Sequence, residues 1–237
     1  MNNRKVAALL ISSVIISSAI TAVLFEYMHK DRIKDWRGNA FLGTIEIVCS
    51  VSGNSTYGTG FIIDFGGPWV VTNAHGVLYN DGTEMTVFPS IQGRFYDSDV
   101  MYDLTCRFYD SEEDIALLSF DNLDRLWKPL SLGDSSKLRY GDKVFTIGNS
   151  RGNGLAFSSG VVSIPLINVI IFDNIRPSVQ TNIPINEGNS GGPVFDECGE
   201  VVGMMSFRMR DQHGEVVQGT SFAIPSNLIK EYIQKSL

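Results

Sequence analysis

Short apolar runs, each bounded by Gly, Asn, Asp or Pro, recur along the chain from Phe41 onward and constrain its fold more than any other sequence feature. Runs of this length between turn-forming residues are typical of β-strands. Many short strands without intervening helices favour a barrel or a sandwich over a parallel α/β sheet. The sequence therefore predicts an all-β domain, with strands expected at 44–51, 60–64, 69–73, 85–88 and 115–120, and in a second series at 143–147, 160–165, 201–207, 216–217 and 221–224.

Two segments break this pattern. Residues 121–136 are rich in turn formers, and we interpret them as the connection between two halves of the domain. The tail changes to helical spacing, with Leu228, Ile229, Tyr232 and Ile233 on one face. Ser226 or Asn227 could cap this helix at its N-terminus. A packing helix is therefore expected at 225–237.

The N-terminus contains a run of 20 uncharged residues, 6–25, after a short flank at 1–5. A helix of this length can span a bilayer, so we expect a membrane anchor there, followed by a linker at 26–40. The alternative is a cleaved signal peptide with an apolar core at 6–16 and cleavage near 17–19, which would give a secreted protein. We favour the anchor because no Ala-x-Ala motif ends the run and its apolar character continues to Phe25.

The net charge and the small numbers of histidines and cysteines argue against several functions. The formal charge is -7, from 26 acidic and 19 basic residues, which argues against nucleic acid as a partner. Three histidines without ligand-like spacing argue against a metal site. Three cysteines, Cys49, Cys106 and Cys198, cannot all pair within the chain and are expected to be small, largely buried side chains. No cofactor is expected.

A glycine-rich stretch at 188–193, Gly-Asn-Ser-Gly-Gly-Pro, has the character of a nucleophile turn. Glycines let the backbone adopt positive φ angles, and the N–H groups of Gly188 and Ser190 can then point at an oxyanion. His75 ends one apolar run and Asp114 begins another. The chain order His, Asp, Ser occurs in acyl-transfer triads, so we predict that His75, Asp114 and Ser190 are catalytic.

At these residues the sequence resembles the trypsin-like serine peptidases of the HtrA/Deg family. The resemblance covers about 41–227 and is carried by five motifs in the family's order: Gly58-Thr59-Gly60-Phe61-Ile62, Thr72-Asn73-Ala74-His75, Asp114-Ile115-Ala116-Leu117-Leu118, Gly188-Asn189-Ser190-Gly191-Gly192-Pro193, and 219–227. It implies two six-stranded antiparallel β-barrels, about 41–125 and 136–225, within a protease domain at 41–237. The histidine and aspartate would lie on the first barrel and the serine on the second.

The resemblance also implies a biological setting. The family acts on misfolded or regulatory proteins, mostly outside the cytoplasm, so we expect protein or peptide substrates and a location in the periplasm or at the cell surface. Basic residues after the apolar run outnumber those before it, which by itself would favour the opposite orientation, but long domains translocate largely regardless of charge. Trimers are common in the family, and a homotrimer is one implied assembly. No PDZ domain is recognisable in this sequence.

Specificity and control can be inferred from the same comparison. The family's primary pocket is walled by segments that correspond here to Ile183, Pro184 and Ile185 and to Met205, Ser206 and Phe207. Because none of these residues is charged, we expect cleavage after small or medium aliphatic residues. Asn189 replaces the aspartate that many secreted trypsin-like enzymes pair with a new N-terminus, which argues against activation by cleavage. Glu187 stands where relatives commonly carry a basic residue. Loops at 164–177, 183–187 and 208–218 are the candidates for control.

Two other interpretations are open. Gly188-x-Ser190-x-Gly192 also fits the nucleophile elbow of α/β-hydrolases, but that elbow precedes a helix, which Gly191, Gly192 and Pro193 oppose. A catalytically silent binding protein that keeps the trypsin-like fold is the second interpretation.

Overall fold

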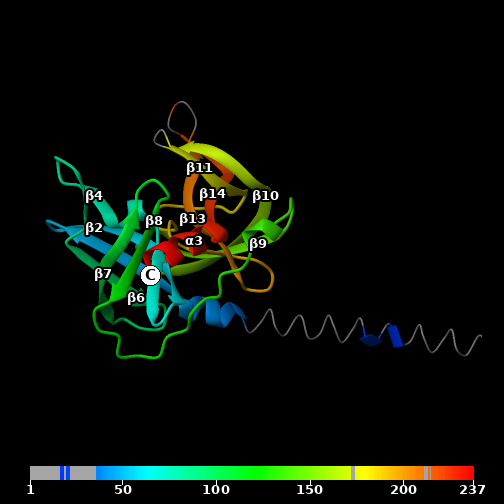
Figure 1. Cartoon of the computed structure of the whole chain (residues 1–237), viewed down its shortest axis with the longest axis horizontal. Helices are drawn as coiled ribbons and strands as arrows, with labels where there is room; N and C mark the ends of the chain where they lie inside the picture. Colours follow the sequence, from blue (N-terminus) through cyan, green and yellow to red (C-terminus); the bar gives the residue numbers. More distant parts are fainter. Residues whose placement is uncertain (1–16, 19, 22–35, 172–173, 211–212, 214) are drawn as a thin grey trace, which may run out of the picture.

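The computed structural model describes residues 17–18, 20–21, 36–171, 174–210, 213 and 215–237 (Figure 1). Strands dominate these ranges and form two closed antiparallel barrels. The first barrel has the order β1-β2-β3-β8-β7-β6 and the second has the order β10-β11-β14-β13-β12-β9. The predictions of an all-β fold with a C-terminal helix are confirmed.

The first barrel consists of β1 (Thr44–Val51), β2 (Asn54–Asp64), β3 (Pro68–Thr72), β6 (Ser90–Phe95), β7 (Met101–Asp110) and β8 (Ile115–Phe120). A two-stranded sheet, β4 (Leu78–Asn80) and β5 (Met85–Val87), lies outside it, and the short helix α2 (Ala74–Val77) follows β3. The second barrel consists of β9 (Lys143–Asn149), β10 (Leu155–Ile171), β11 (Asn174–Thr181), β12 (Pro193–Phe195), β13 (Val201–Arg210) and β14 (Val216–Pro225). Two 3₁₀ turns, η1 (Ser135–Lys137) and η2 (Ser150–Gly152), and helix α3 (Ser226–Ser236) complete the described elements.

Side chains on one face of the strands fill the interior of each barrel. Side chains on the other face of some strands pack in a cluster between the two barrels. Ile62 packs inside the first barrel, whereas its neighbours Phe61 and Ile63 belong to a cluster shared with Phe195 and Met204 of the second barrel. Successive strand residues point to opposite faces, so β2 is buried on both. This shared cluster fixes the two barrels against each other.

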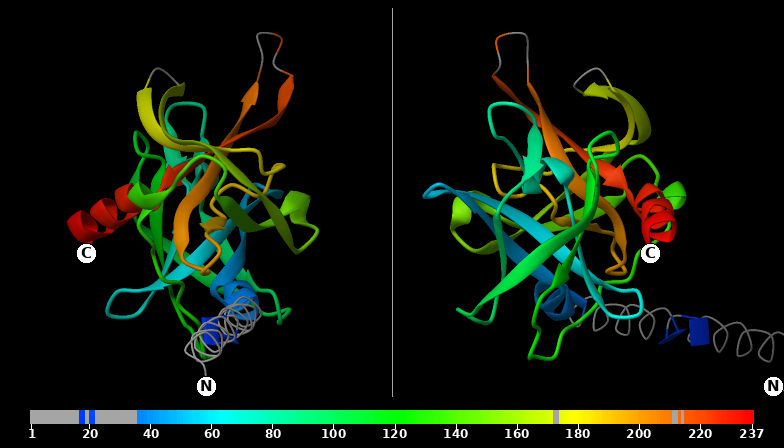
Figure 2. Two further views of the ribbon diagram at one scale, coloured as in Figure 1. Left: turned by 90° about the vertical axis from the view of Figure 1, so that its right-hand side faces the viewer. Right: turned by 60° about the vertical axis from the view of Figure 1, so that its left-hand side comes forward.

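Helix α3 packs on the shared cluster through Ile229 and Ile233, and Figure 2 shows it on the outside of the molecule. Its predicted cap is wrong. Pro225 occupies the N-cap position without a side-chain hydrogen bond, and the Ser226 hydroxyl instead donates to the Gly133 carbonyl at 2.8 Å. The helix is therefore held by the inter-barrel connection.

The packed region begins before the expected linker ends. Residues 36–43 are helical, and Trp36 contacts Phe145 and Phe195 of the second barrel, with ring centroids 5.7 Å and 5.2 Å away. Residues 36–40 are thus part of the domain rather than a free linker, because aromatic burial fixes them there. Among the cysteines, Cys49 is buried but Cys198 is exposed, so the expectation of buried cysteines is wrong for Cys198.

Of the predicted membrane span 6–25, only residues 17, 18, 20 and 21 fall within the described ranges. Among the described residues, no helix combines the length and the apolar character needed to cross a bilayer. The predicted span itself lies largely outside the described residues.

Candidate active site

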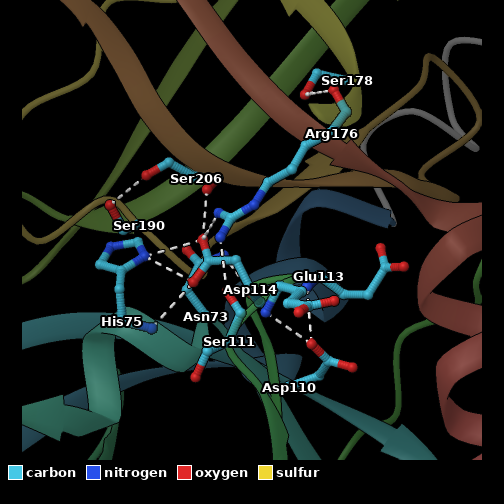
Figure 3. Close-up of polar contacts among 11 residues, drawn as sticks. Asn73, His75, Asp110, Ser111, Glu113, Asp114, Arg176, Ser178, Ser190 and Ser206 are labelled. Atoms are coloured by element: carbon cyan, nitrogen blue, oxygen red, sulfur yellow. Dashed lines mark hydrogen bonds and ion pairs between the residues drawn. The ribbon is translucent and has the colours of Figure 1, made fainter. Parts of the chain in front are cut away.

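His75 and Asp114 form a tight pair on the first barrel (Figure 3). His75 lies on α2, and Asp114 closes the turn between β7 and β8 at a positive φ of 58°. The His75 Nδ1 atom is 2.9 Å from both carboxylate oxygens of Asp114, and the His75 backbone N–H donates to Asp114 Oδ1 at 3.0 Å. Asn73 Nδ2 donates to the Asp114 carbonyl at 3.1 Å. Asp114 therefore fixes the orientation of the imidazole ring and leaves its Nε2 facing outward.

Asp114 is 3% exposed. Burial alone raises the pKa of Asp114, but the hydrogen bonds and charge of His75, together with the hydroxyl of Ser206, outweigh it and hold this pKa below its ordinary value. Ser206 Oγ, from β13, donates to Asp114 Oδ2 at 2.7 Å. Asp114 is thus kept ionised and fully hydrogen-bonded inside the protein.

Ser190 lies on the second barrel, in the glycine turn that precedes β12. Gly188 and Gly191 have φ angles of 93° and 84°. A side chain at Gly188 would collide with the Asn149 carbonyl, and one at Gly191 would collide with the Thr59 carbonyl. Only glycine fits at both positions, so the predicted nucleophile turn depends on them.

Thr59 of β2 joins this turn to the first barrel. Its N–H donates to the Ser190 carbonyl at 3.0 Å, and its hydroxyl donates to the Gly188 carbonyl at 2.6 Å. The same hydroxyl accepts the Asn149 N–H at 2.9 Å. Because Thr59 contacts the turn on both sides of Asn189, it sets the position of Ser190 relative to the barrel that carries His75.

The predicted oxyanion donors, the N–H groups of Gly188 and Ser190, make no backbone hydrogen bond to any described residue. The Glu187 carbonyl accepts the Arg151 N–H at 2.8 Å, and Asn189 N–H donates to the Asn186 carbonyl at 3.1 Å. Neither donor is therefore occupied by a backbone acceptor in the described part of the chain, which an oxyanion hole requires.

The Ser190 hydroxyl donates to the Ser206 carbonyl at 2.9 Å rather than to His75. Ser206 thus contacts Ser190 through its carbonyl and Asp114 through its hydroxyl, and it links the three predicted catalytic residues in one hydrogen-bond network (Figure 3). A rotation about the Cα–Cβ bond of Ser190 is the change that would bring its hydroxyl toward the imidazole.

Two cavities meet at His75. One, of about 740 Å³, extends past Gly188 and Ser190 toward Tyr57 and Arg151. The other, of about 520 Å³, is lined by Leu78, Met85, Phe207 and polar groups that include Asp114 and Arg176. Together they form an open cleft that could receive an extended chain across His75.

The residues predicted to wall the primary pocket have different positions. Ile183 and Met205 are 1% and 0% exposed and belong to the interior of the second barrel. Pro184 is exposed, Ile185 packs on the barrel interior, and Phe207 stacks on Phe222 at 4.7 Å and lines the cleft. Ser206 contacts Asp114 and Ser190. These residues thus do not form one continuous wall: a bulge between Met205 and Phe207 interrupts the alternation of β13, so Met205 faces the barrel interior and Phe207 faces the cleft.

Sequence reasoning missed three residues of this site: Thr59, Ser206 as a partner of Asp114, and Arg176. Thr59 lies inside a motif whose signal is its glycines, and Ser206 belongs to a segment that the resemblance places in the pocket wall. Arg176 carried no signal, because it follows no motif and its partners are distant in sequence. No group of three His, Cys, Asp or Glu side chains in the described ranges is arranged to bind a metal ion.

Known proteins that are similar to this chain in sequence are trypsin-like serine proteases. The family described as a trypsin-like peptidase domain matches residues 58–204. The chain is 35% identical over 173 residues to the periplasmic serine endoprotease DegP of Salmonella typhimurium, covering 73% of this chain and 34% of that protein. It is 32% identical over 178 residues to the periplasmic pH-dependent serine endoprotease DegQ of Escherichia coli, covering 75% of this chain and 36% of DegQ.

A solved structure of the HtrA-type protease AlgW with a tripeptide superposes with a TM-score of 0.72 at 25% identity, covering 86% of this chain and 62% of that one. The chain spans about a third of the length of the curated relatives it matches.

Proposed function

Because the chain belongs to the trypsin-like peptidase family and is related to HtrA-type proteases, we propose that it is a serine endopeptidase with His75, Asp114 and Ser190 as its catalytic triad. His75 Nε2 takes the Ser190 proton as Ser190 Oγ bonds to the substrate carbonyl carbon. The N–H groups of Gly188 and Ser190 stabilise the oxyanion. His75 then returns the proton to the leaving amine, the C–N bond breaks, and water releases the acyl group by the same route.

One observation carries the proposal. The Asp114 carboxylate holds His75 Nδ1 at 2.9 Å, and His75 lines the same cavity as Ser190 and Gly188. A base of fixed orientation, a serine on a glycine turn and two backbone N–H donors without a backbone partner are the components that acyl transfer requires.

The test is labelling of the purified protein with a fluorophosphonate probe, which reacts with activated serines. Wild-type protein should be labelled at Ser190, and Ser190→Ala should abolish both labelling and casein cleavage while keeping the wild-type melting temperature. The expected loss of turnover exceeds about a hundredfold, since the nucleophile is removed. Turnover above about a hundredth of wild type in Ser190→Ala would contradict the proposal.

A silent binding protein is the second candidate, and the contact between the Ser190 hydroxyl and the Ser206 carbonyl favours it. In that case the serine stays turned away from His75. Absence of labelling in a folded wild-type protein, with or without a bound peptide, would support this candidate over the peptidase.

For substrates, we infer proteins or peptides cleaved after small or medium aliphatic residues. Support comes from the apolar residues Leu78, Met85 and Phe207 along the cleft. Digestion of a denatured protein followed by mass spectrometry of the new C-termini tests this inference. Cleavage concentrated after Lys, Arg or Glu would contradict it. The same proposal includes misfolded or regulatory proteins as the natural substrates. It also includes a homotrimer as an assembly of the chain.

For location, we infer a domain outside the cytoplasm, anchored by residues 6–25. The matched relatives DegP and DegQ are named as periplasmic, and the uncharged run is long enough to span a bilayer. In cells that express the whole chain, alkaline carbonate extraction should leave it with the membranes, and N-terminal sequencing should find an uncleaved start. A mature N-terminus near Ile20 with the protein in the soluble fraction would instead indicate a cleaved signal peptide.

A further inference from the structure

Arg176 places a buried cation beside the candidate catalytic pair. The residue lies on β11, and its side chain is 11% exposed. Its Nη2 donates to the Ser111 carbonyl at 2.6 Å, and its Nη1 is 3.8 Å from Asp114 Oδ2. The Nε atom is buried and has no hydrogen-bond partner among the described residues. Figure 3 shows the guanidinium reaching from the second barrel to the turn that carries Asp114.

These contacts connect the two barrels at the residue that orients His75. Asp110 Oδ1 accepts the N–H groups of Glu112 and Glu113 and closes the β7–β8 turn from within. Arg176 holds the same turn from outside, at Ser111. A guanidinium with an unpartnered buried Nε is costly to place, so barrel packing alone does not account for it.

The charges around the pair make Arg176 the relevant cation. In the described ranges, it is the one Arg or Lys whose nitrogen lies within 4.0 Å of Asp114. Ser206 on β13 is uncharged. On the turn itself, Asp110 is engaged with backbone N–H groups, and Glu112 and Glu113 are exposed and screened by water.

On the other side of His75, Arg151 and Glu187 line the cavity, and Glu187 Oε1 is 3.6 Å from Arg208 Nη2 of β13. Behind it, Cys49 Sγ donates to the Gly76 carbonyl, and burial raises the pKa of Cys49 to about 12, so this thiol is neutral. Neither Arg151 nor Arg208 has a nitrogen within 4.0 Å of the Asp114 carboxylate, so Arg176 is the nearest cation among these groups.

We propose that Arg176 is a positioning residue that holds the Asp114 turn and, through its charge, opposes proton uptake by the Asp114–His75 pair. This inference rests on the proposed function, because it assigns Arg176 a role in keeping the catalytic base unprotonated. A cation near a carboxylate stabilises the carboxylate and disfavours a second cation on its partner. The pair would then remain ready to accept the Ser190 proton at a lower pH than it would without Arg176.

The experiment measures the second-order rate of fluorophosphonate labelling of the full chain from about pH 4 to about pH 9. In Arg176→Gln, the pH at which this rate falls to half its plateau on the acid side should move up by about 0.5 to 1 unit. Arg176→Lys keeps the charge and should retain most of the wild-type profile. Arg107→Gln removes an equal charge from an exposed position on β7 and should leave the profile unchanged.

Circular dichroism at each pH confirms that the variants are folded, and Arg176→Met, which keeps the apolar stem, replaces Arg176→Gln if the latter does not fold. The role of Arg176 would be overturned if the labelling rate of an uncharged variant fell to half its plateau at the same acidic pH as wild type. It would also be overturned if this pH moved equally in Arg176→Lys and Arg176→Gln. Failure of the proposed function is a separate result: in that case folded wild-type protein is not labelled, or Ser190→Ala is labelled as fast as wild type.

Discussion

Asn189, the residue immediately before the candidate nucleophile, is only 6% exposed, and its side-chain Oδ1 has no partner among the described residues. In Asn189→Asp a carboxylate would be buried there without a cation. We expect a loss of about 2 kcal/mol or more in the free energy of unfolding at about pH 7. Such a carboxyl has a folded-state pKa above its unfolded value, so the loss should shrink as pH falls toward about 4.

Urea unfolding at both pH values checks this expectation, with Asn54→Asp as the control, because Asn54 is exposed in a hairpin. Equal stability of Asn189→Asp and wild type at neutral pH would show that a charge is accommodated at this position. That result would reopen the possibility that the position takes part in a salt bridge.

At the residue scale, the candidate catalytic side chains could be predicted from the sequence, but the residues that position them could not. His75, Asp114 and Ser190 lie in motifs that can be recognised from the glycines and apolar residues next to them in the sequence. Arg176 and Ser111, in contrast, are 65 residues apart and meet only because the second barrel packs on the first. Ser206 also reaches Asp114 across 92 residues. Contacts of this kind depend on tertiary packing, which no local pattern reports.

Among the elements, α3 packs against both barrels, since Ile229 and Ile233 join a cluster with side chains from each of them. Ile229→Ala should therefore destabilise the protein by about 2 to 4 kcal/mol, because Ile229 is 0% exposed and its loss leaves a cavity. The two barrels should still unfold in one transition. Urea unfolding followed by circular dichroism and by tryptophan fluorescence measures both, with Gln234→Ala on the exposed face of α3 as the control. Two separated transitions would contradict this coupling.

Prediction of individual elements succeeded where apolar runs are long and failed where one face of a strand is exposed. Strands β1, β3 and β8 and helix α3 lie close to their expected positions. Strands β6 and β7 were missed because exposed polar residues alternate with buried ones, as in Ser90–Phe95. The 17-residue β10 was expected only at 160–165, because exposed side chains such as Leu166 and Ile170 obscure its pattern. The closure of each set into a barrel was implied by the resemblance to a family, not by periodicity.

For the whole molecule, the site depends on both barrels at once. The first carries His75 and Asp114, the second carries Ser190, and Thr59 and Ser206 join them across the interface. Two hairpins, β10–β11 and β13–β14, project from the same end of the second barrel (Figures 1 and 2). They contain two of the three regions expected to control activity, 164–177 and 208–218, which were expected as loops but are largely strand in their described parts. An effector bound there would act by shifting the population of the competent site, and it could raise turnover at most by the reciprocal of the resting population.

The uncleaved chain should therefore be active, though at a low level. Asn189 offers no carboxylate to a new N-terminus, and the N–H groups of Gly188 and Ser190 have no backbone acceptor among the described residues. The remaining step is rotation of the Ser190 hydroxyl from the Ser206 carbonyl toward His75, and side-chain rotation needs no cleavage. Fluorophosphonate labelling of the intact protein should accordingly proceed within about tenfold of its rate after limited proteolysis. If labelling were absent before a cut and complete after it, a zymogen mechanism would operate and this interpretation of Asn189 would be wrong.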